Sequence, residues 1–200
     1  MSAAMGGYQT SQLTAVNGDT ISWQTTYNWA GAPLDVKSYA NLNLRVGINQ
    51  PLASIASIPA AWDWTYSSAS YDLIADVSFD LWLSDFAYTA GATSSSTFEI
   101  MIWLSARGGA GPAGYQIDET SINGVTWKLF KGTVSTWIVF SFVASMEITS
   151  FDQDLMPFFI YLINKQNIPS SQFLVQAQAG TEPFIGSATL TTTSYSMAIY

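Results

Sequence analysis

The sequence predicts an all-β fold, a sandwich or a barrel, formed as one domain. Short stretches of alternating apolar and polar residues recur along the chain, separated by Gly, Asn, Asp, Ser and Pro. A chain of 200 residues is long enough for one sizeable core and short for two domains. Because 48% of the residues are hydrophobic and only 10% are charged, the chain has the composition of a folded protein. We expect a single domain over residues 1–200.

The alternating stretches define the expected strands. In order, they are residues 21–29, 40–46, 58–64, 71–83, 97–104, 115–117, 125–131, 137–148, 172–180 and 188–199. Turn residues lie between them, notably Gly31-Ala-Pro33 and the Gly-rich loop 108–114.

One segment has a different period. Its apolar residues are Leu155, Phe158, Phe159, Leu162 and Ile163, a spacing that places them on one face of a helix. The pattern predicts one helix over residues 152–164. Asp152 or Asp154 is the expected cap, and Pro157 fits only in the first turn.

Charge and composition limit the chemistry. The net charge of −8 disfavours nucleic acid as a partner. The chain has no Cys and no His, which excludes a thiolate nucleophile, a serine–histidine mechanism and a histidine-based metal site; we expect neither metal nor cofactor.

No apolar run approaches the ~18 residues of a membrane span, and Met1–Gly7 lacks the apolar run of a signal peptide. The 14% aromatic content fits binding of neutral glycans as well as an ordinary acidic β-protein.

Two glutamates stand in contexts that favour catalysis. Glu99 lies in Phe-Glu-Ile-Met-Ile-Trp, where an ionised carboxylate is costly unless its face lines a wet cleft. Met101 and Trp103 share that face, and an exposed Trp103 indole beside a carboxylate resembles a sugar subsite. Glu182 follows a strand on which Gln176 and Gln178 have the same parity.

Two carboxylates on separate strands suit glycoside hydrolysis, in which one attacks the anomeric carbon and the other protonates the leaving oxygen. Asp80, on a third strand with cleft-side parity, could orient the nucleophile and separate the two pKa values. The alternative is that these acids are ordinary edge or surface residues.

At these residues the sequence resembles glycoside hydrolase family 12. Glu99-Ile-Met-Ile-Trp103 looks like that family's nucleophile strand, Gly180-Thr-Glu182-Pro-Phe184 like its acid/base strand, and Val77-Ser-Phe-Asp80-Leu like the strand of its assisting Asp. Further matching segments, in the family's order, are Val36-Lys-Ser-Tyr39, Gly111-Pro112, Phe140-Ser-Phe-Val143-Ala and Asp154-Leu-Met-Pro-Phe-Phe159. The resemblance covers residues 7–200.

The resemblance implies a β-jelly roll of two packed antiparallel sheets with a concave cleft. It implies an endo-β-1,4-glucanase that retains anomeric configuration, with Glu99 as nucleophile, Glu182 as general acid/base and Asp80 assisting. Met101, Trp103, Pro112 and Phe184 would line the cleft. A β-glucan substrate, secretion and a monomeric state are further expectations.

The chain departs from the family pattern at its start. Family members usually begin 20–30 residues earlier, with an Asn-Leu-Trp segment whose Trp stacks on a sugar, and many have an N-terminal disulfide. The sequence lacks both features. The resemblance therefore implies a catalytic domain without that edge strand and that sugar subsite.

The substrate and two rival functions stay open. The loop 108–112, Gln178-Ala-Gly180 and the segment 190–195 look more like the family's xyloglucan-cleaving branch than its plain cellulase branch. An endo-β-1,4-xylanase of the sister jelly-roll family is disfavoured, because its catalytic segments are not matched. A non-catalytic carbohydrate-binding module or lectin fits the composition equally well but does not need two glutamates on separate cleft strands.

Overall fold

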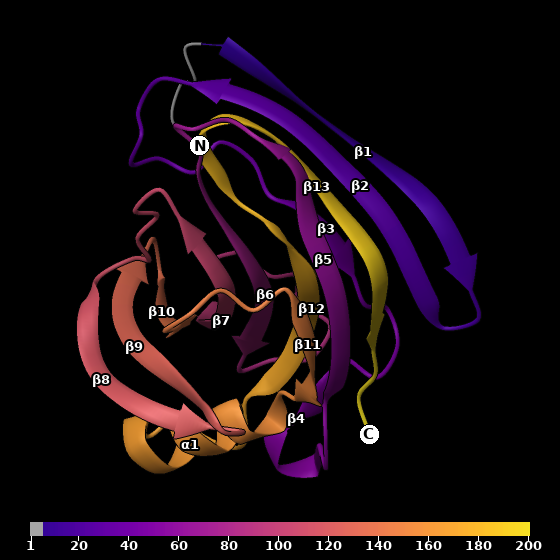
Figure 1. Cartoon of the computed structure of the whole chain (residues 1–200). Helices are drawn as coiled ribbons and strands as arrows, with labels where there is room; N and C mark the ends of the chain where they lie inside the picture. The colour runs from indigo at the N-terminus through magenta and orange to yellow at the C-terminus, as the bar shows by residue number, and fades with distance from the viewer. Residues whose placement is uncertain (1–5) are drawn as a thin grey trace.

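The computed structural model describes residues 6–200, so residues 1–5 of the expected domain lie outside the described part. The chain forms two sheets that pack face to face, with one α-helix at an end of the sandwich (Figure 1). A two-sheet all-β fold with a helix is what the sequence predicted.

The first sheet contains the long N-terminal hairpin. Its strands, in spatial order, are β1 (Gly6–Asn17), β2 (Thr20–Ala30), β13 (Pro183–Met197), β5 (Pro59–Ala69) and β11 (Ser150–Asp154). The sequence reading missed β1. Most of its residues are exposed, so the strand lacks the buried apolar face that makes alternation visible.

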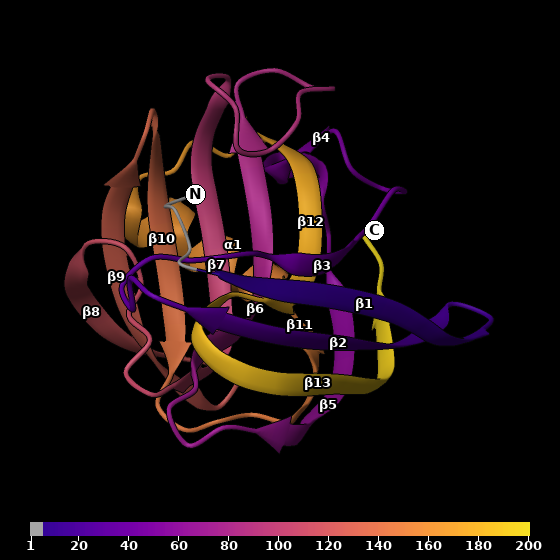
Figure 2. The ribbon, with the colours of Figure 1, turned by 90° about the horizontal axis from the view of Figure 1, so that it is seen from above.

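The second sheet carries the face on which the site is built. Its strands, in spatial order, are β12 (Phe173–Thr181), β6 (Ile74–Ser84), β7 (Ser96–Arg107), β10 (Trp137–Ala144), β9 (Val125–Val134) and β8 (Tyr115–Ile122). The short strands β3 (Ala40–Asn43) and β4 (Gln50–Pro51) pair with the other edge of β12, and a 3₁₀ turn, η1 (Leu52–Ser54), follows β4. In the view of Figure 2, β1, β2 and β13 run across the direction of β6, β7 and β12.

One strand pair differs from the expected antiparallel sheets. β10 pairs with β7 in parallel, whereas the other strand pairs in the described residues are antiparallel. The chain leaves β7, makes the antiparallel meander β8–β9–β10 and returns beside β7. This crossover is long enough for a parallel connection.

The core lies between the two sheets. On β6 the residues Val77, Phe79, Leu81 and Leu83 point into it, and on β7 the residues Ile100, Ile102 and Leu104 do so. The alternate residues of both strands therefore lie on the opposite face of the second sheet. This confirms the predicted two-residue period.

The predicted helix exists but begins later. Asp152 and Asp154 belong to β11, and α1 spans Met156–Gln166 with Pro157 in its first turn. Pro157 has no N–H to donate, which suits a helix start. Asp154, the second proposed cap, accepts the backbone N–H of Met156 at 2.9 Å, although the cap position itself is Leu155.

The helix covers the core beside β9 and β10. Phe158 packs edge-on against Trp127 and Phe142, with ring centroids 5.0 Å apart in both pairs. These contacts fix the end of the sandwich where β9 and β10 meet α1 (Figure 1).

β13 connects the two sheets. Its first residues pair with β6 in the second sheet, and from Gly186 onward it lies in the first sheet, between β2 on one edge and β5 on the other. Glu182 lies immediately before this strand, at the corner where the chain passes from one sheet to the other.

Candidate active site

A cavity of about 690 Å³ opens on the face of the second sheet that points away from the core. It is lined by all seven site residues predicted from the sequence, namely Asp80, Glu99, Met101, Trp103, Pro112, Glu182 and Phe184. The lining residues in the described part of the chain include no Lys or Arg. The cavity is therefore acidic and aromatic.

Strand register brings these residues together. Trp82 of β6 lies opposite Glu99 of β7, and Gln176 of β12 lies opposite Trp82. Asp80 similarly lies between Gln178 and Met101. A bulge in β12 at Val175 shifts the register, which keeps Leu174 and Ala177 in the core while the two glutamines face the cavity.

Glu99 is held by an indole. The Nε1–H of Trp137 donates to Glu99 Oε2 at 2.7 Å. Burial raises the pKa of Glu99 from 4.5 to about 7, while the Trp137 hydrogen bond favours the anion and opposes that rise. Glu99 is thus partly buried but has a dedicated donor for its ionised form.

Glu182 has the opposite environment. Its pKa is raised well above the ordinary value, first by burial, then by the charge and hydrogen bond of Asp76, and also by the charge of Glu99. No donor to its carboxyl opposes these effects among the recorded hydrogen bonds of the described residues. The protonated form of Glu182 is therefore favoured.

Asp80 lies on the same face, and its carboxyl is affected by the charges of both glutamates. Its Oδ2 accepts the Nε1–H of Trp82 at 2.9 Å, and its buried Oδ1 has no hydrogen-bond partner. Burial and the charges of Glu99 and Glu182 raise the pKa of Asp80 well above its usual range.

Apolar side chains form the floor of the cavity. Met101, Trp103 and Phe184 pack together with Val139 and Ala110. Trp103 is only 2% exposed, and its Nε1–H points to Met101 Sδ at 3.4 Å. The expectation of an exposed Trp103 indole is therefore wrong, because the packing of this cluster covers its faces.

The loop that carries Pro112 is fixed by a glycine. Gly114 has φ +85°, and a Cβ there would lie 1.9 Å from the carbonyl oxygen of Lys131. Only glycine allows this close approach of loop and β9. Gly111, Pro112 and Ala113 lie on the cavity rim, and for Pro112 this is the position that the family resemblance implied.

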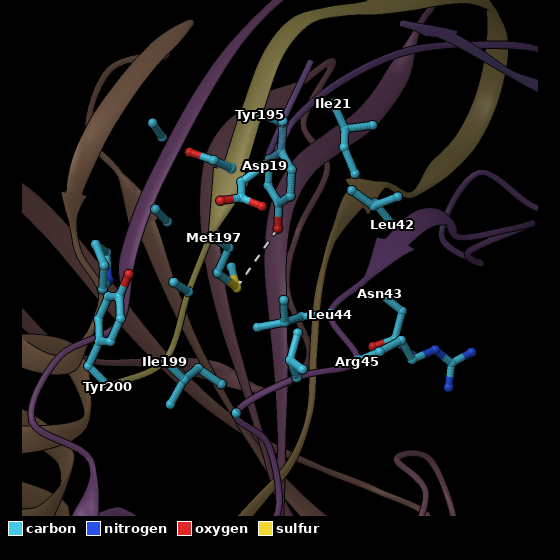
Figure 3. Close-up of a pocket in the computed structure, with 18 of the residues that line it drawn as sticks. Asp19, Ile21, Leu42, Asn43, Leu44, Arg45, Tyr195, Met197, Ile199 and Tyr200 are labelled. Atoms are coloured by element: carbon cyan, nitrogen blue, oxygen red, sulfur yellow. Dashed lines mark hydrogen bonds between the residues drawn. The ribbon is translucent and has the colours of Figure 1, made fainter. Parts of the chain in front are cut away.

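A second cavity, of about 670 Å³, lies elsewhere on the molecule (Figure 3). Figure 3 shows Leu42, Leu44 and Met197 reaching into it. Its acidic residues, Asp19 and Asp152, are exposed. Solvated carboxylates at a rim are poorly suited to acid–base chemistry, so the carboxyl cluster of the first cavity is the candidate active site.

Neither a metal site nor a membrane span was found in residues 6–200. No group of three or more acidic side chains among them is arranged to hold a metal ion. Their one α-helix, with 11 residues, is too short to cross a bilayer.

The family model for glycosyl hydrolase family 12 matches residues 2–200. The chain belongs to this family. The resemblance seen in the catalytic segments is thereby confirmed over the whole described chain.

Two curated relatives show how the family's members differ. The chain is 44% identical to xyloglucan-specific endo-β-1,4-glucanase A of Emericella nidulans, over 98% of this chain and 80% of that protein. It is 45% identical to the inactive glycoside hydrolase XLP1 of Phytophthora nicotianae, over 98% of this chain and 81% of that protein. Family 12 membership at this identity therefore does not decide whether a chain is active.

Solved family 12 structures confirm the β-jelly roll. Endoglucanase 3 of Trichoderma harzianum superposes with a TM-score of 0.91 at 34% identity, over 98% of this chain and 85% of that one.

The sequence analysis assigned no role to several residues that lie in or beside this cavity. Trp137 was read only as the start of a strand, and Tyr39 only as part of a matching segment. Asp76 was given no role, although it shares a strand face with Asp80. The signal for Asp76 was present, since its parity matches Asp80, but its proximity to Glu182 depends on strand pairing.

The raised carboxyl pKa values predict a pH-dependent stability. A carboxyl whose pKa is raised by folding stabilises the folded state below its unfolded pKa, and this contribution is lost as pH rises through the folded pKa. For Glu99 this stabilising contribution is lost between pH 4.5 and about pH 7. Glu99→Gln should therefore raise the free energy of unfolding at pH 8 by roughly 2 kcal/mol, allowing for partial exposure, and leave it unchanged at pH 4.

Thermal unfolding at the two pH values measures this effect. The matched control is Glu119→Gln, which removes an exposed carboxyl on β8 and should change the Tm little at either pH. An equal Tm change for Glu99→Gln at pH 4 and pH 8 would contradict the argument.

Proposed function

We propose that this chain is a retaining endo-β-1,4-glucanase that cleaves internal bonds of xyloglucan. Glu99 acts as nucleophile, Glu182 as general acid/base, and Asp80 orients and tunes the pair. The observation that carries the proposal is the contrast between the two glutamates: one cavity holds both, yet only Glu99 has a donor that favours its anion.

This contrast supplies the two protonation states that the reaction needs. The Glu99 carboxylate attacks the anomeric carbon while the bond to the leaving glycosyl oxygen breaks, and the proton of Glu182 passes to that oxygen. A water molecule then attacks the glycosyl–enzyme ester, the Glu182 carboxylate accepts its proton, and Glu99 leaves as the carboxylate. Two inversions give net retention.

The cavity also suits a neutral polysaccharide. Its polar lining includes the amides of Gln176, Gln178 and Asn41, and partly exposed aromatic side chains are provided by Trp137 and Tyr39. Amides and aromatic faces bind sugar hydroxyls and rings without ion pairs. The loop residues Gly111 and Pro112 form part of the rim.

The choice of xyloglucan rests on the relatives. The Emericella nidulans protein is named xyloglucan-specific, and the loop 108–112 and the segment 190–195 had the features of that branch. Since polymeric β-glucan is too large to enter a cell, the enzyme would act outside the cell. We also propose that it acts as a monomer.

A second candidate function is glycan binding without turnover. The specific observation in its favour is the 45% identity to an inactive family member. Against it, this chain keeps Glu99, Glu182 and Asp80 in one cavity, and binding alone would not need their shared desolvation.

The nucleophile can be tested by chemical rescue. Glu99→Ala should lower kcat on the order of 10⁴-fold or more, because covalent catalysis is lost. Added azide should restore part of the activity and yield a glycosyl azide of inverted configuration. Near-normal turnover by the variant, without any azide effect, would refute the assignment.

The pH dependence follows from the two raised pKa values. The rate constant kcat/KM should rise as Glu99 ionises, with a limb displaced toward its pKa of about 7, and fall at higher pH as Glu182 loses its proton. We therefore expect the optimum near neutral pH rather than in the acid range in which free carboxyls titrate. A flat profile from pH 4 to pH 9 would exclude the two-carboxyl mechanism.

Substrate choice is measured by reducing-end release from xyloglucan, mixed-linkage β-glucan, carboxymethylcellulose and xylan, side by side at pH 6. Strong release from xyloglucan alone is expected. Preference for the unbranched glucans would correct the branch assignment. Binding of xyloglucan oligosaccharide in a calorimeter with no product from any polymer would favour the non-catalytic function.

A further inference from the structure

β6 carries two acidic residues, and one of them, Asp76, is bonded directly to Glu182. Asp76 is fully buried, and unlike Asp80 it does not line the cavity. It therefore cannot touch a substrate in this arrangement, and a buried carboxyl without such a role requires an explanation.

Backbone bonds lock Asp76 and Glu182 together. The N–H of Asp76 donates to the carbonyl oxygen of Glu182 at 3.2 Å, and the N–H of Glu182 donates to Asp76 Oδ1 at 3.2 Å. Thr181 Oγ1 donates to the carbonyl oxygen of Asp76 at 2.6 Å. The two residues are thus held in fixed register at the start of β13.

The two oxygens of the Asp76 carboxyl differ in their partners. Oδ1 accepts the Ser78 hydroxyl at 3.1 Å as well as the Glu182 N–H. Oδ2 is buried and has no donor. Because the Glu182 N–H is bonded to Oδ1, the two carboxyl groups belong to bonded neighbours, and the charge of Asp76 disfavours ionisation of Glu182. Two carboxyl groups can hydrogen-bond to each other only if one of them carries a proton.

Among the described residues, no Lys or Arg side chain is paired with either carboxyl of this pair. Tyr27 of β2 and Tyr66 of β5 face Asp76 with their hydroxyls 3.3 Å apart, and Tyr39 faces both Asp76 and Glu182. The pKa of each of these tyrosines is raised by burial, so all three are neutral near pH 7.

The remaining charges near the pair are also accounted for. Arg107 lies over the Tyr66 ring, but its guanidinium is bonded to Glu147 at 2.7 Å. Asp80 and Glu99, from β6 and β7, add negative charge. A proton is therefore the group that can satisfy Asp76 and Glu182 together.

We propose that Asp76 is a positioning residue that shares one proton with Glu182 and thereby keeps the Glu182 carboxyl protonated and aimed for its role as general acid. The inference deepens the proposed function and rests on it for the role of Glu182. When Glu182 gives its proton to the leaving oxygen, the Asp76–Glu182 pair is left as two anions, which makes Glu182 a ready base for the water of the second step.

A carboxyl titration tests the shared proton without any need for turnover. The chain has four glutamates, Glu99, Glu119, Glu147 and Glu182, so a protein with ¹³C-labelled glutamate carboxyls gives few signals. The Glu182 signal is assigned by its loss in Glu182→Gln. In Asp76→Asn, the midpoint of the Glu182 titration should fall by about one pH unit or more, because the like charge is removed.

Two controls separate this role from a structural one. Ser78→Ala removes a contact to the same carboxyl but leaves its charge, and should keep the high Glu182 midpoint. Asp19→Asn removes one charge at the second cavity and should also leave it in place. An unchanged Glu182 midpoint in folded Asp76→Asn, or an equal fall in Ser78→Ala, would overturn the proposal. If Asp76→Asn does not fold, Asp76→Ser gives the same comparison.

A kinetic arm ties the shared proton to catalysis. In Asp76→Asn the alkaline limb of kcat/KM should move down by about the same amount as the Glu182 midpoint. An aryl cellobioside with a dinitrophenyl leaving group needs no acid, so its glycosylation should be unaffected by the substitution above neutral pH. An equal loss for both kinds of substrate would show that Asp76 does not act through Glu182. A wild-type protein that cleaves nothing would refute the proposed function, while the titration would still decide the inference.

Discussion

Desolvation of like-charged groups is the constraint on which the site depends. Asp80, Glu99 and Glu182 line one cavity on the side of the second sheet away from the core, Asp76 is buried beside Glu182, and the cavity-lining residues in the described chain include no cation. Four anions in such a place would repel one another strongly. This repulsion is reduced by protonation of some of the carboxyls and by neutral hydrogen-bond donors. The indoles of Trp82 and Trp137 each donate to one carboxyl. The individual pKa values follow from how these donors are distributed.

The destabilising effect of this carboxyl cluster explains why the strands that carry it also pack into a large core. Every second residue of β6 and β7 enters a core of large aromatic and aliphatic side chains, and α1 closes one end of that core. A functional cluster of this kind reduces stability at neutral pH, and the rest of the fold must offset that loss. Because side chains alternate along a strand, the core-facing residues of β6 and β7 stabilise the fold, while the acidic residues on their opposite face destabilise it.

The sequence predicted the period-two strands, the helix and the acids on the cavity face, because these depend on local pattern. Contacts between neighbouring strands were harder to predict from the sequence. Trp137 reaches Glu99 only because β10 returns in parallel beside β7, and Asp76 meets Glu182 only because β13 starts beside β6. No local pattern encodes those pairings. The exposed strand β1 lacked a buried face, and the exposure of Trp103 was misjudged because side chains from other strands cover it.

The path of β13 has a mechanical consequence. Glu182 lies just before β13, whose first residues Pro183 and Ile185 pair with β6 of the second sheet, and β13 enters the first sheet only from Gly186 onward. Glu182 and Glu99 are therefore both held by the second sheet, on opposite sides of β6. Beyond Gly186, β13 can follow a movement of the first sheet without changing the gap between the two carboxyls, because the bonds between Asp76 and Glu182 hold Glu182 to β6.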